Sequence, residues 1–172
     1  MDLIIRLAEP TDSANLLALL RQLSQESDTF CITQDLETID AITEAQNITA
    51  IQQTRNNLML VVADEDDNLY GLATATALLD SPEVAEVGVA ILKAYQGYGL
   101  AQGLIAELID WGETFSTINQ LWLTVQKRNT PAIHIYEKFG FSVVLDAQSN
   151  GQEDEATAWP TQAMQLNMTG GE

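Results

Sequence analysis

A glycine-containing turn between a predicted strand and a predicted helix constrains this chain more than any other stretch. The turn runs from Gln96 to Ala101 and reads QGYGLA. An apolar segment at 84–92 precedes it, and apolar residues recur every three or four positions after it, which predicts a strand and then a helix. Such a turn suits an anion, because glycines let the backbone approach closely and the first N–H groups of a helix point outward unpaired.

Three anion-binding motifs compete for this turn, and their spacing separates them. The dinucleotide-binding motif needs Gly-x-Gly-x-x-Gly/Ala, but counting from Gly97 the sixth position is Gln102, and Gly103 comes one residue too late. The P-loop ends in Gly-Lys-Ser/Thr, and the chain contains no Gly-Lys pair. The third pattern, Gln/Arg-x-x-Gly-x-Gly/Ala, is satisfied by residues 96–101 at every defined position.

Two stretches of the chain together resemble the GCN5-related N-acetyltransferase (GNAT) family. The first is the turn with residues 91–95 before it (ILKAY), where the family has Val-x-Pro-x-Tyr and this chain has Lys93 in place of the common proline. The second is 129–141 (NTPAIHIYEKFGF), which is similar to the family's Asn-x-x-Ala-x-x-Leu-Tyr-Glu-Lys-x-Gly-Phe. The close match covers residues 84–141, and the order of strands and helices extends it to residues 2–145.

The fold that this resemblance implies is a mixed, mostly antiparallel central sheet of about six to seven strands flanked by about four helices, in the α+β or α/β class. The length fits one domain over residues 1–172. Helices are predicted after Thr11, near 36–51, at 100–115 and from Thr130 to Gly140, with the two threonines as N-caps. Pro160 should bend the last strand or confine it to an edge. Strands are predicted at 2–8, 57–63, 69–79, 84–92, 121–125, 141–145 and 158–168.

The resemblance implies acetyl-coenzyme A (acetyl-CoA) as co-substrate and no metal. Two parallel strands splay apart in the family, so backbone N–H groups of Val89, Ala90 and Ile91 would hold the pantetheine arm and polarise the thioester carbonyl. Asn129 would hydrogen-bond the same arm. The pyrophosphate would lie at the helix N-terminus, on the turn that Gln96 opens and on the amides of Gly97, Tyr98, Gly99, Leu100 and Ala101.

The reaction that the resemblance implies is direct acyl transfer in a ternary complex, in which a neutral primary amine attacks the thioester and the CoA thiolate leaves. Tyr136, a phenol with an ordinary pKa of about 10, would protonate the thiolate. A free alkylamine is protonated at neutral pH, so a base must accept its proton. Glu86 on the strand before the turn is the candidate, since family members often carry a glutamate there that works through water, and Glu83 is the second choice.

Other functions are weighed against this one on particular residues. A catalytically silent acyl-CoA binding or sensing module would keep the turn without needing Tyr136, so the tyrosine favours an enzyme. His134 is the only histidine and falls at a variable position of the family's motif, which argues against a histidine metal site or a serine relay. Cys31 is the only cysteine, so no intrachain disulfide can form, and direct transfer needs no thiol nucleophile.

The charge of the chain bears on its partners. A net charge of −18 argues against nucleic acid and anionic lipid surfaces, although it also serves simply to keep a protein soluble. Residues 93–138 are neutral, because four basic residues balance four acidic ones there. The acceptor is expected to be a cationic small-molecule or peptide amine, since Glu26, Asp28, Asp35 and Glu37 lie where the family selects it. The candidate contacts for the cofactor's phosphates are Lys93, Lys127, Arg128 and Lys138.

The start of the chain and its apolar runs predict a soluble, cytoplasmic protein. Residues 1–6 lack the basic start and apolar run of a signal peptide, and no stretch reaches the roughly 18 apolar residues of a membrane span. A single cysteine suits a reducing compartment. If the protein forms a homodimer, the polar loop at 148–156 and the final strand are the expected contacts.

Overall fold

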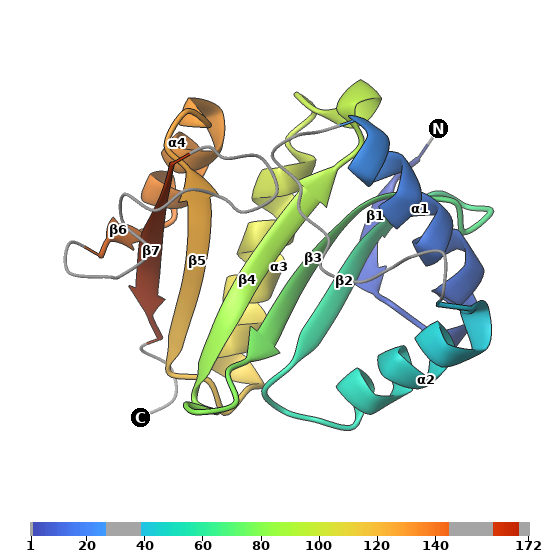
Figure 1. The fold of residues 1–172 in the computed structure, drawn as a ribbon, viewed down its shortest axis with the longest axis horizontal. Coiled ribbons are helices and arrows are strands. Elements are labelled where there is room, and N and C mark those ends of the chain that lie inside the picture. Colours follow the sequence, from blue (N-terminus) through green and yellow to red (C-terminus); the bar gives the residue numbers. More distant parts are fainter. Residues whose placement is uncertain (1, 27–38, 145–159, 169–172) are drawn as a thin grey trace.

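A mixed, seven-stranded sheet runs through the middle of the molecule (Figure 1). The computed structural model describes residues 2–26, 39–144 and 160–168. Within them the strand order is β1-β2-β3-β4-β5-β7-β6, and β4 pairs with β5 in parallel while the other neighbours are antiparallel. This confirms the predicted mixed, mostly antiparallel sheet. The strands are β1 (Ile4–Leu7), β2 (Leu58–Ala63), β3 (Leu69–Ala77), β4 (Val84–Ile91), β5 (Gln120–Gln126), β6 (Ser142–Val143) and β7 (Thr161–Asn167).

Helices cover the sheet on both faces (Figure 1). On one face, α1 (Ser13–Glu26) and α2 (Ala41–Gln52) pack against β2 and β3. On the other face, α3 (Leu100–Thr114) packs against β3 and β4, and α4 (Thr130–Lys138) adds side chains to the same core. Two short 3-10 turns, η1 (Pro10–Asp12) and η2 (Lys93–Tyr95), lead into α1 and into the glycine turn.

Alternation along the strands separates the two cores. In β5, Leu121, Leu123 and Val125 are buried in the core that contains α3, as their period of two predicts. Trp122 and Thr124 alternate with them and therefore point to the opposite face, the one that carries α1 and α2. The side chains of β5 are thus buried in a hydrophobic core on one face of the sheet, whereas those on the opposite face belong to neither helix-covered core.

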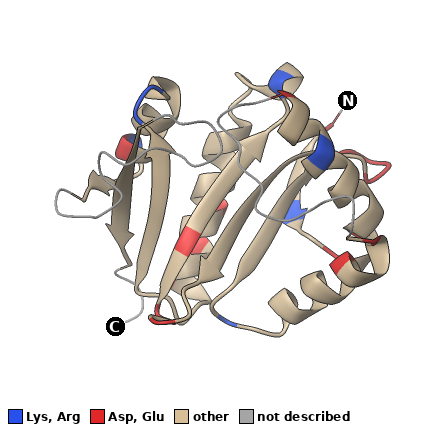
Figure 2. Cartoon of the chain, viewed as in Figure 1, with Lys and Arg blue, Asp and Glu red and all other residues tan. Residues whose placement is uncertain are grey.

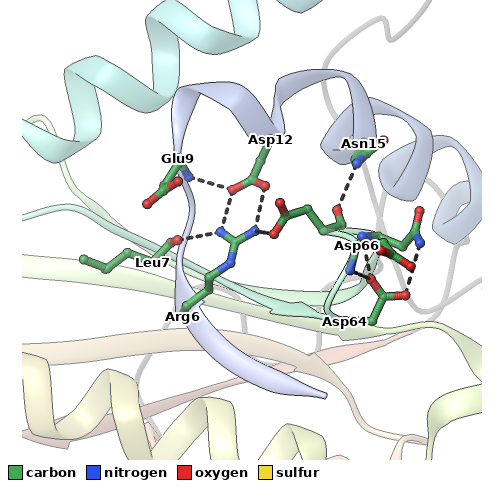
Figure 3. A network of polar contacts seen from close by, with 9 residues as sticks. Arg6, Leu7, Glu9, Asp12, Asn15, Asp64 and Asp66 are labelled. Atoms are coloured by element: carbon green, nitrogen blue, oxygen red, sulfur yellow. Dashed lines mark hydrogen bonds and ion pairs between the residues drawn. The ribbon is translucent and has the colours of Figure 1, made fainter. Parts of the chain in front are cut away.

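A buried ion pair fastens β1 to the start of α1 (Figure 3). The guanidinium of Arg6 donates to both carboxylate oxygens of Asp12, at 2.7 and 2.8 Å, and also to Asp67 at 3.0 Å in the turn between β2 and β3. Asp12 in turn accepts the backbone N–H of Glu9 at 2.8 Å. These bonds hold the first strand, the first helix and the β2–β3 hairpin in one arrangement.

Two helix starts differ from the prediction by one or two residues. Asp12, and not Thr11, accepts a backbone N–H before α1, because its carboxylate is already held there by the Arg6 guanidinium. Asn129, and not Thr130, caps α4, since its side-chain oxygen accepts the N–H of Ala132 at 3.4 Å. In α4 an amide oxygen one position earlier replaces the predicted hydroxyl, and asparagine is a good N-cap residue. Asp12 has a different role, because it accepts from Glu9 before it, as the third residue of the turn η1 in a capping box.

Three predicted positions lie elsewhere than expected. The apolar helical spacing of Leu36, Ile39 and Ile42 predicts one buried face, but Ile42 is 71% exposed, because Asp40 caps α2 and that spacing runs across the helix start. Phe115 is 62% exposed, because α3 ends at Thr114 and the helical spacing no longer applies. Pro160 precedes β7, which lies between β5 and β6, so the prediction of an edge strand is wrong: a proline before the first strand residue removes no bond from the ladder.

Several predictions concern parts of the chain outside the described residues. Cys31, Leu145, the acidic positions at 28–37 and the polar loop at 148–156 belong to this group. Among the helices that the structure describes, none has the length and apolar character needed to cross a membrane.

Candidate active site

The parallel strands β4 and β5 pair over only part of their length. Their register joins Val84 to Gln120, Ala85 to Leu121 and Glu86 to Trp122. Beyond that point both strands continue, to Ile91 and to Gln126, without pairing with each other. Figure 1 shows β4 leaning away from β5 in this direction. The sheet therefore has a gap at the carboxyl end of its one described parallel pair, as the family resemblance predicts.

The register of β4 decides which of its backbone groups face the gap. Leu92 N–H donates to the Tyr70 carbonyl at 2.9 Å, which makes these residues a hydrogen-bonded pair with β3. Such pairs alternate along an antiparallel ladder, so Ala90 also directs its N–H and C=O to β3. Val89 and Ile91 direct theirs into the gap. The prediction that the Ala90 amide serves the gap is therefore wrong, because β3 already uses it.

The glycine turn leaves the start of α3 open. Gly97 and Gly99 have φ angles of 90° and 79°, in the left-handed region that favours glycine. Gly99 is the N-cap, no side chain caps the helix, and its first turn has no acidic residue. No hydrogen bond within the described part of the chain uses the N–H groups of Leu100 and Ala101. This terminus offers unpaired donors and a positive dipole end to an anion.

Gln96, which the sequence motif assigned to the cofactor site, forms hydrogen bonds that fix the glycine turn in the structure. Its side-chain amide donates to the Ile91 carbonyl at 3.0 Å, and its backbone N–H donates to the Lys93 carbonyl at 3.3 Å. Both donors thus hold the turn against the end of β4. A second support comes from Tyr95, whose ring lies 4.4 Å from that of Tyr70 on β3.

Tyr136 lies on α4, beside the start of α3. The two helices are joined where Lys138 Nζ donates to Gln102 Oε1 at 3.2 Å, in the first turn of α3. The Tyr136 ring is half-buried and meets Phe141 edge-on at a centroid distance of 5.6 Å. Its hydroxyl makes no hydrogen bond to any described residue. Desolvation by burial raises the pKa of Tyr136 to about 12, so the phenol keeps its proton at neutral pH.

Asn129 has a structural role that its motif position did not predict. Its side-chain oxygen caps α4 by accepting the Ala132 N–H, while its backbone N–H donates to the Gln126 carbonyl at 2.9 Å. The side-chain NH₂ group has no acceptor in the described part of the chain. An asparagine that caps a helix in this way can hold the helix and still offer two N–H donors to a ligand.

Glu86 lies in the middle of β4, at the last residue that pairs with β5. Its side chain is exposed and makes no hydrogen bond or ion pair within the residues described. Partial desolvation raises the pKa of Glu86 above its ordinary value. Glu83, the second candidate base, precedes β4 at the opposite end, about 20 Å along the strand from Val89. The strand geometry therefore favours Glu86.

The four candidate phosphate contacts differ in position. Lys138 reaches the first turn of α3, as described, whereas Arg128 donates from Nε to Gln126 Oε1 at 2.8 Å. Lys93 lies just before the glycine turn, and its backbone N–H donates to Glu26 Oε1 at 2.8 Å. Figure 2 shows these basic segments at the upper ends of η2 and α4, on either side of the turn. His134 is exposed on α4.

Sequence reasoning left one site neighbour unassigned. Trp122 pairs in register with Glu86, and the alternation of residues 120–126 was already sufficient to put it on the face opposite Leu121 and Leu123. The signal was present in the strand pattern, but a lone tryptophan in a strand does not reveal what lies next to it.

Comparison with known proteins gives the family. The family model for the acetyltransferase (GNAT) family matches residues 19–141. Spermidine N(1)-acetyltransferase of Escherichia coli K12 is 38% identical over 82 residues, which is 48% of this chain and 44% of that protein. A [ribosomal protein bS18]-alanine N-acetyltransferase of Haemophilus influenzae is 35% identical over 51% of this chain and 56% of its own length. The chain thus matches about half the length of these curated relatives.

Solved structures agree over nearly the whole chain. An acetyltransferase of the GNAT family from Streptococcus pneumoniae superposes with a TM-score of 0.84 at 26% identity, over 97% of this chain and 100% of that one. A putative acetyltransferase from Salmonella typhimurium, solved with its cofactor acetyl-CoA, has the same fold with a TM-score of 0.78 at 21% identity, over 98% and 95%. By its sequence motifs, its fold and the family match over most of its length, this chain belongs to the GNAT family of acetyltransferases.

Proposed function

We propose that this protein is an enzyme that transfers an acetyl group from acetyl-CoA to a primary amine by direct attack in a ternary complex. The observation that carries the proposal is the end of the β4–β5 pair, where an uncapped helix start meets a gap lined by the free backbone groups of Val89. An anionic, extended thioester needs both features, one for its phosphates and one for its arm and carbonyl. Relatives named as acetyltransferases of spermidine and of a protein alanine support an amine acceptor.

The residues present fit the co-substrate. The start of α3 has no side-chain cap or first-turn carboxylate to compete with a phosphate, and Cβ atoms built at Gly97 and Gly99 meet nothing within 4 Å. Amides of residues 97–101 would hold the pyrophosphate, with Lys138 beside them. Asn129 would donate to the pantetheine arm from its free NH₂ group. When bound, acetyl-CoA supplies an acyl group activated as a thioester.

Three groups of this chain would then act on the transfer. The N–H of Val89 would donate to the carbonyl oxygen as negative charge develops there, a contribution on the order of 3 kcal/mol for one donor aimed at an oxyanion. Glu86 would accept a proton from the acceptor's ammonium group through water, so that the neutral amine can attack, and its raised pKa brings it closer to neutral pH. Tyr136 would donate its hydroxyl proton to the departing sulfur.

Release of free thiol from acetyl-CoA, measured across a panel of amines, tests the proposal. The panel should contain polyamines, aminoglycosides and peptides with a free amino end, with calorimetric titration of CoA alongside. We expect thiol release that depends on one class of amine. Tight binding of CoA with no amine-dependent release would contradict the proposal and make the protein a silent acyl-CoA binding module.

A further inference from the structure

A row of side chains crosses the sheet at the point where β4 and β5 separate. The registers set Thr76 of β3, Glu86 of β4, Trp122 of β5, Gln165 of β7 and Ser142 of β6 side by side. Partners in register present their side chains on the same face of a sheet. This is the face on which α1 and α2 pack, but those helices lie over the β2–β3 side, and α3 lies behind the sheet (Figure 1).

Trp122 is not used to build either hydrophobic core. Its neighbours Leu121 and Leu123 are fully buried against the α3 side, whereas the indole of Trp122 is half-exposed and packs in neither cluster of buried residues. The indole N–H has no acceptor among the residues that the structure describes. A tryptophan on an inner strand with a half-exposed ring, and with no partner for its N–H among the described residues, is available to a ligand.

The charge beside Trp122 defines the ligand's chemistry. Glu86 is the only charged residue in the sequences of β3, β4, β5, β6 and β7, and Figure 2 shows it as the single red segment of β4. None of the described Lys or Arg side chains pairs with it. A partly desolvated carboxylate next to an indole ring attracts an alkylammonium group, through charge and through the negative face of the ring.

The distance to the gap gives the ligand's shape. Glu86 and Val89 are three residues apart, which is about 10 Å along an extended strand. Gly88, which shares the face of Glu86 between them, has no side chain, and a Cβ there would lie 3.2 Å from Thr74 Oγ1. No side chain at Gly88 therefore projects from the sheet surface between Trp122 and Val89, so an extended alkyl chain can lie along that surface.

We propose that Trp122 determines acceptor specificity by binding the second, non-reacting ammonium of a diamine or polyamine against its indole face, while the Glu86 carboxylate attracts the doubly charged acceptor and stays available as the base for its reacting amine. The inference rests on the proposed acetyl transfer and names the class of its acceptor. The reacting amine then lies toward Val89, and the row from Trp122 to Ser142 offers hydroxyl and amide groups to a longer polyamine.

Paired acceptors test this inference. 1,4-Diaminobutane and butylamine share one alkyl chain and differ in the second ammonium. Trp122→Ala should raise the KM for diaminobutane about tenfold while the KM for butylamine changes less than about twofold, the size expected when a partly desolvated cation–ring contact is lost. For Trp122→Phe, which keeps a smaller ring, the KM for diaminobutane should lie between the values for the wild type and for Trp122→Ala. Trp111→Phe, on α3 and outside the row, is the matched control and should leave both KM values unchanged.

A binding measurement separates this inference from the proposed reaction. Diaminobutane titrated into the CoA complex should change the intrinsic fluorescence of the wild-type protein and of Trp111→Phe, and this change should be lost in Trp122→Phe. If no amine promotes thiol release but this Trp122-dependent signal remains, the proposed reaction fails and the amine site stands. Equal fluorescence changes in Trp122→Phe and the wild type, or equal KM increases for both amines, would overturn the inference.

Discussion

Tyr136 combines a half-buried ring with a hydroxyl that no described residue uses. Its raised pKa, about 12, means that the hydroxyl holds its proton throughout the neutral range and so remains a hydrogen-bond donor for sulfur as the thiolate leaves. Tyr136→Phe keeps the contact with Phe141 and removes only the proton donor. We expect kcat to fall at least about tenfold, with little change in CoA affinity, in steady-state assays and CoA titrations.

The control for this prediction lies on the same helix. His134 is exposed, so His134→Gln should leave both kcat and CoA affinity unchanged. An unchanged kcat in Tyr136→Phe would remove the tyrosine from the mechanism.

Glu86 should control the acidic limb of the pH profile. A base must be ionised to act, and burial raises the pKa of Glu86, so kcat/KM should fall as the pH drops through a value above the 4.5 of an ordinary glutamate. Glu86→Gln should abolish this limb and lower kcat/KM at neutral pH by at least about tenfold. Glu83→Gln, at the other end of the strand, should keep the wild-type limb. If Glu86→Gln keeps the acidic limb of the kcat/KM profile, the base is a group other than Glu86.

At the scale of the elements, one substitution in the first turn of α3 should raise the stability of the protein and lower its affinity for acetyl-CoA. Gln102→Glu would put a carboxylate beside the unpaired N–H groups and next to Lys138. The helix dipole should stabilise the fold by about 0.3 to 1 kcal/mol, while repulsion of the cofactor phosphates by about 1 kcal/mol should raise the KM for acetyl-CoA about fivefold. Thermal unfolding and steady-state kinetics measure the two effects.

Ala106→Glu is the matched variant for this test. It adds the same charge at an exposed position one turn further along α3, where the effect of the helix terminus has decayed. The KM for acetyl-CoA should stay near its wild-type value there. A similar KM increase in both variants would indicate general charge repulsion and not a phosphate site at the helix start.

The elements that could be predicted from the sequence are those with a strong local period. β5 and α3 follow from alternation and from apolar residues at helical spacing, and the glycine turn from its motif. Caps were harder to predict, because the choice between Thr130 and Asn129 depends on which side chain can reach the Ala132 N–H. The outward face of Ile42 could not be predicted, since Asp40 starts the helix later than the apolar spacing suggested.

At the scale of the whole molecule, the Arg6–Asp12 pair makes the fold sensitive to acid. The Arg6 guanidinium holds the pKa of Asp12 below its ordinary 3.8, and the Tyr70 hydroxyl lowers that of Asp64 to about 2. A lowered folded-state pKa contributes stability above the ordinary value and loses it as the pH falls through the folded one. The wild type should therefore lose stability from about pH 4 down to about pH 2.

Asp12→Asn tests this acid sensitivity. Replacing the carboxylate should lower the free energy of unfolding at pH 7 by about 2 kcal/mol, because the partly buried guanidinium loses its main partner. The difference from the wild type should start to shrink below about pH 4 and disappear as the pH falls through the lowered pKa of Asp12. Urea unfolding at several pH values measures it. Asp66→Asn is the control, since that exposed carboxylate bonds no described residue, and an equal loss there would contradict the role of the pair.

The assembly of the site was predictable only in part, because most of its geometry is non-local. The motifs named Tyr136 and the turn, but the register alone shows that Ala90 serves β3 and that Val89 faces the gap. The hydrogen bond from Gln96 to Ile91 and the neighbourhood of Trp122 and Glu86 likewise depend on which strands pair. Residue patterns give the parts of a site, whereas strand pairing decides which parts meet.

The early end of the β4–β5 pairing has a consequence for amide hydrogen exchange. Alternate residues of one strand should behave differently: Ala90 and Leu92, bonded to β3, should exchange slowly, and Val89, which faces the gap, should exchange fast. Bound acetyl-CoA should slow Val89 and leave its two neighbours as they were. Such a result would mean that the incomplete β4–β5 ladder is completed by a molecule that is not part of the chain.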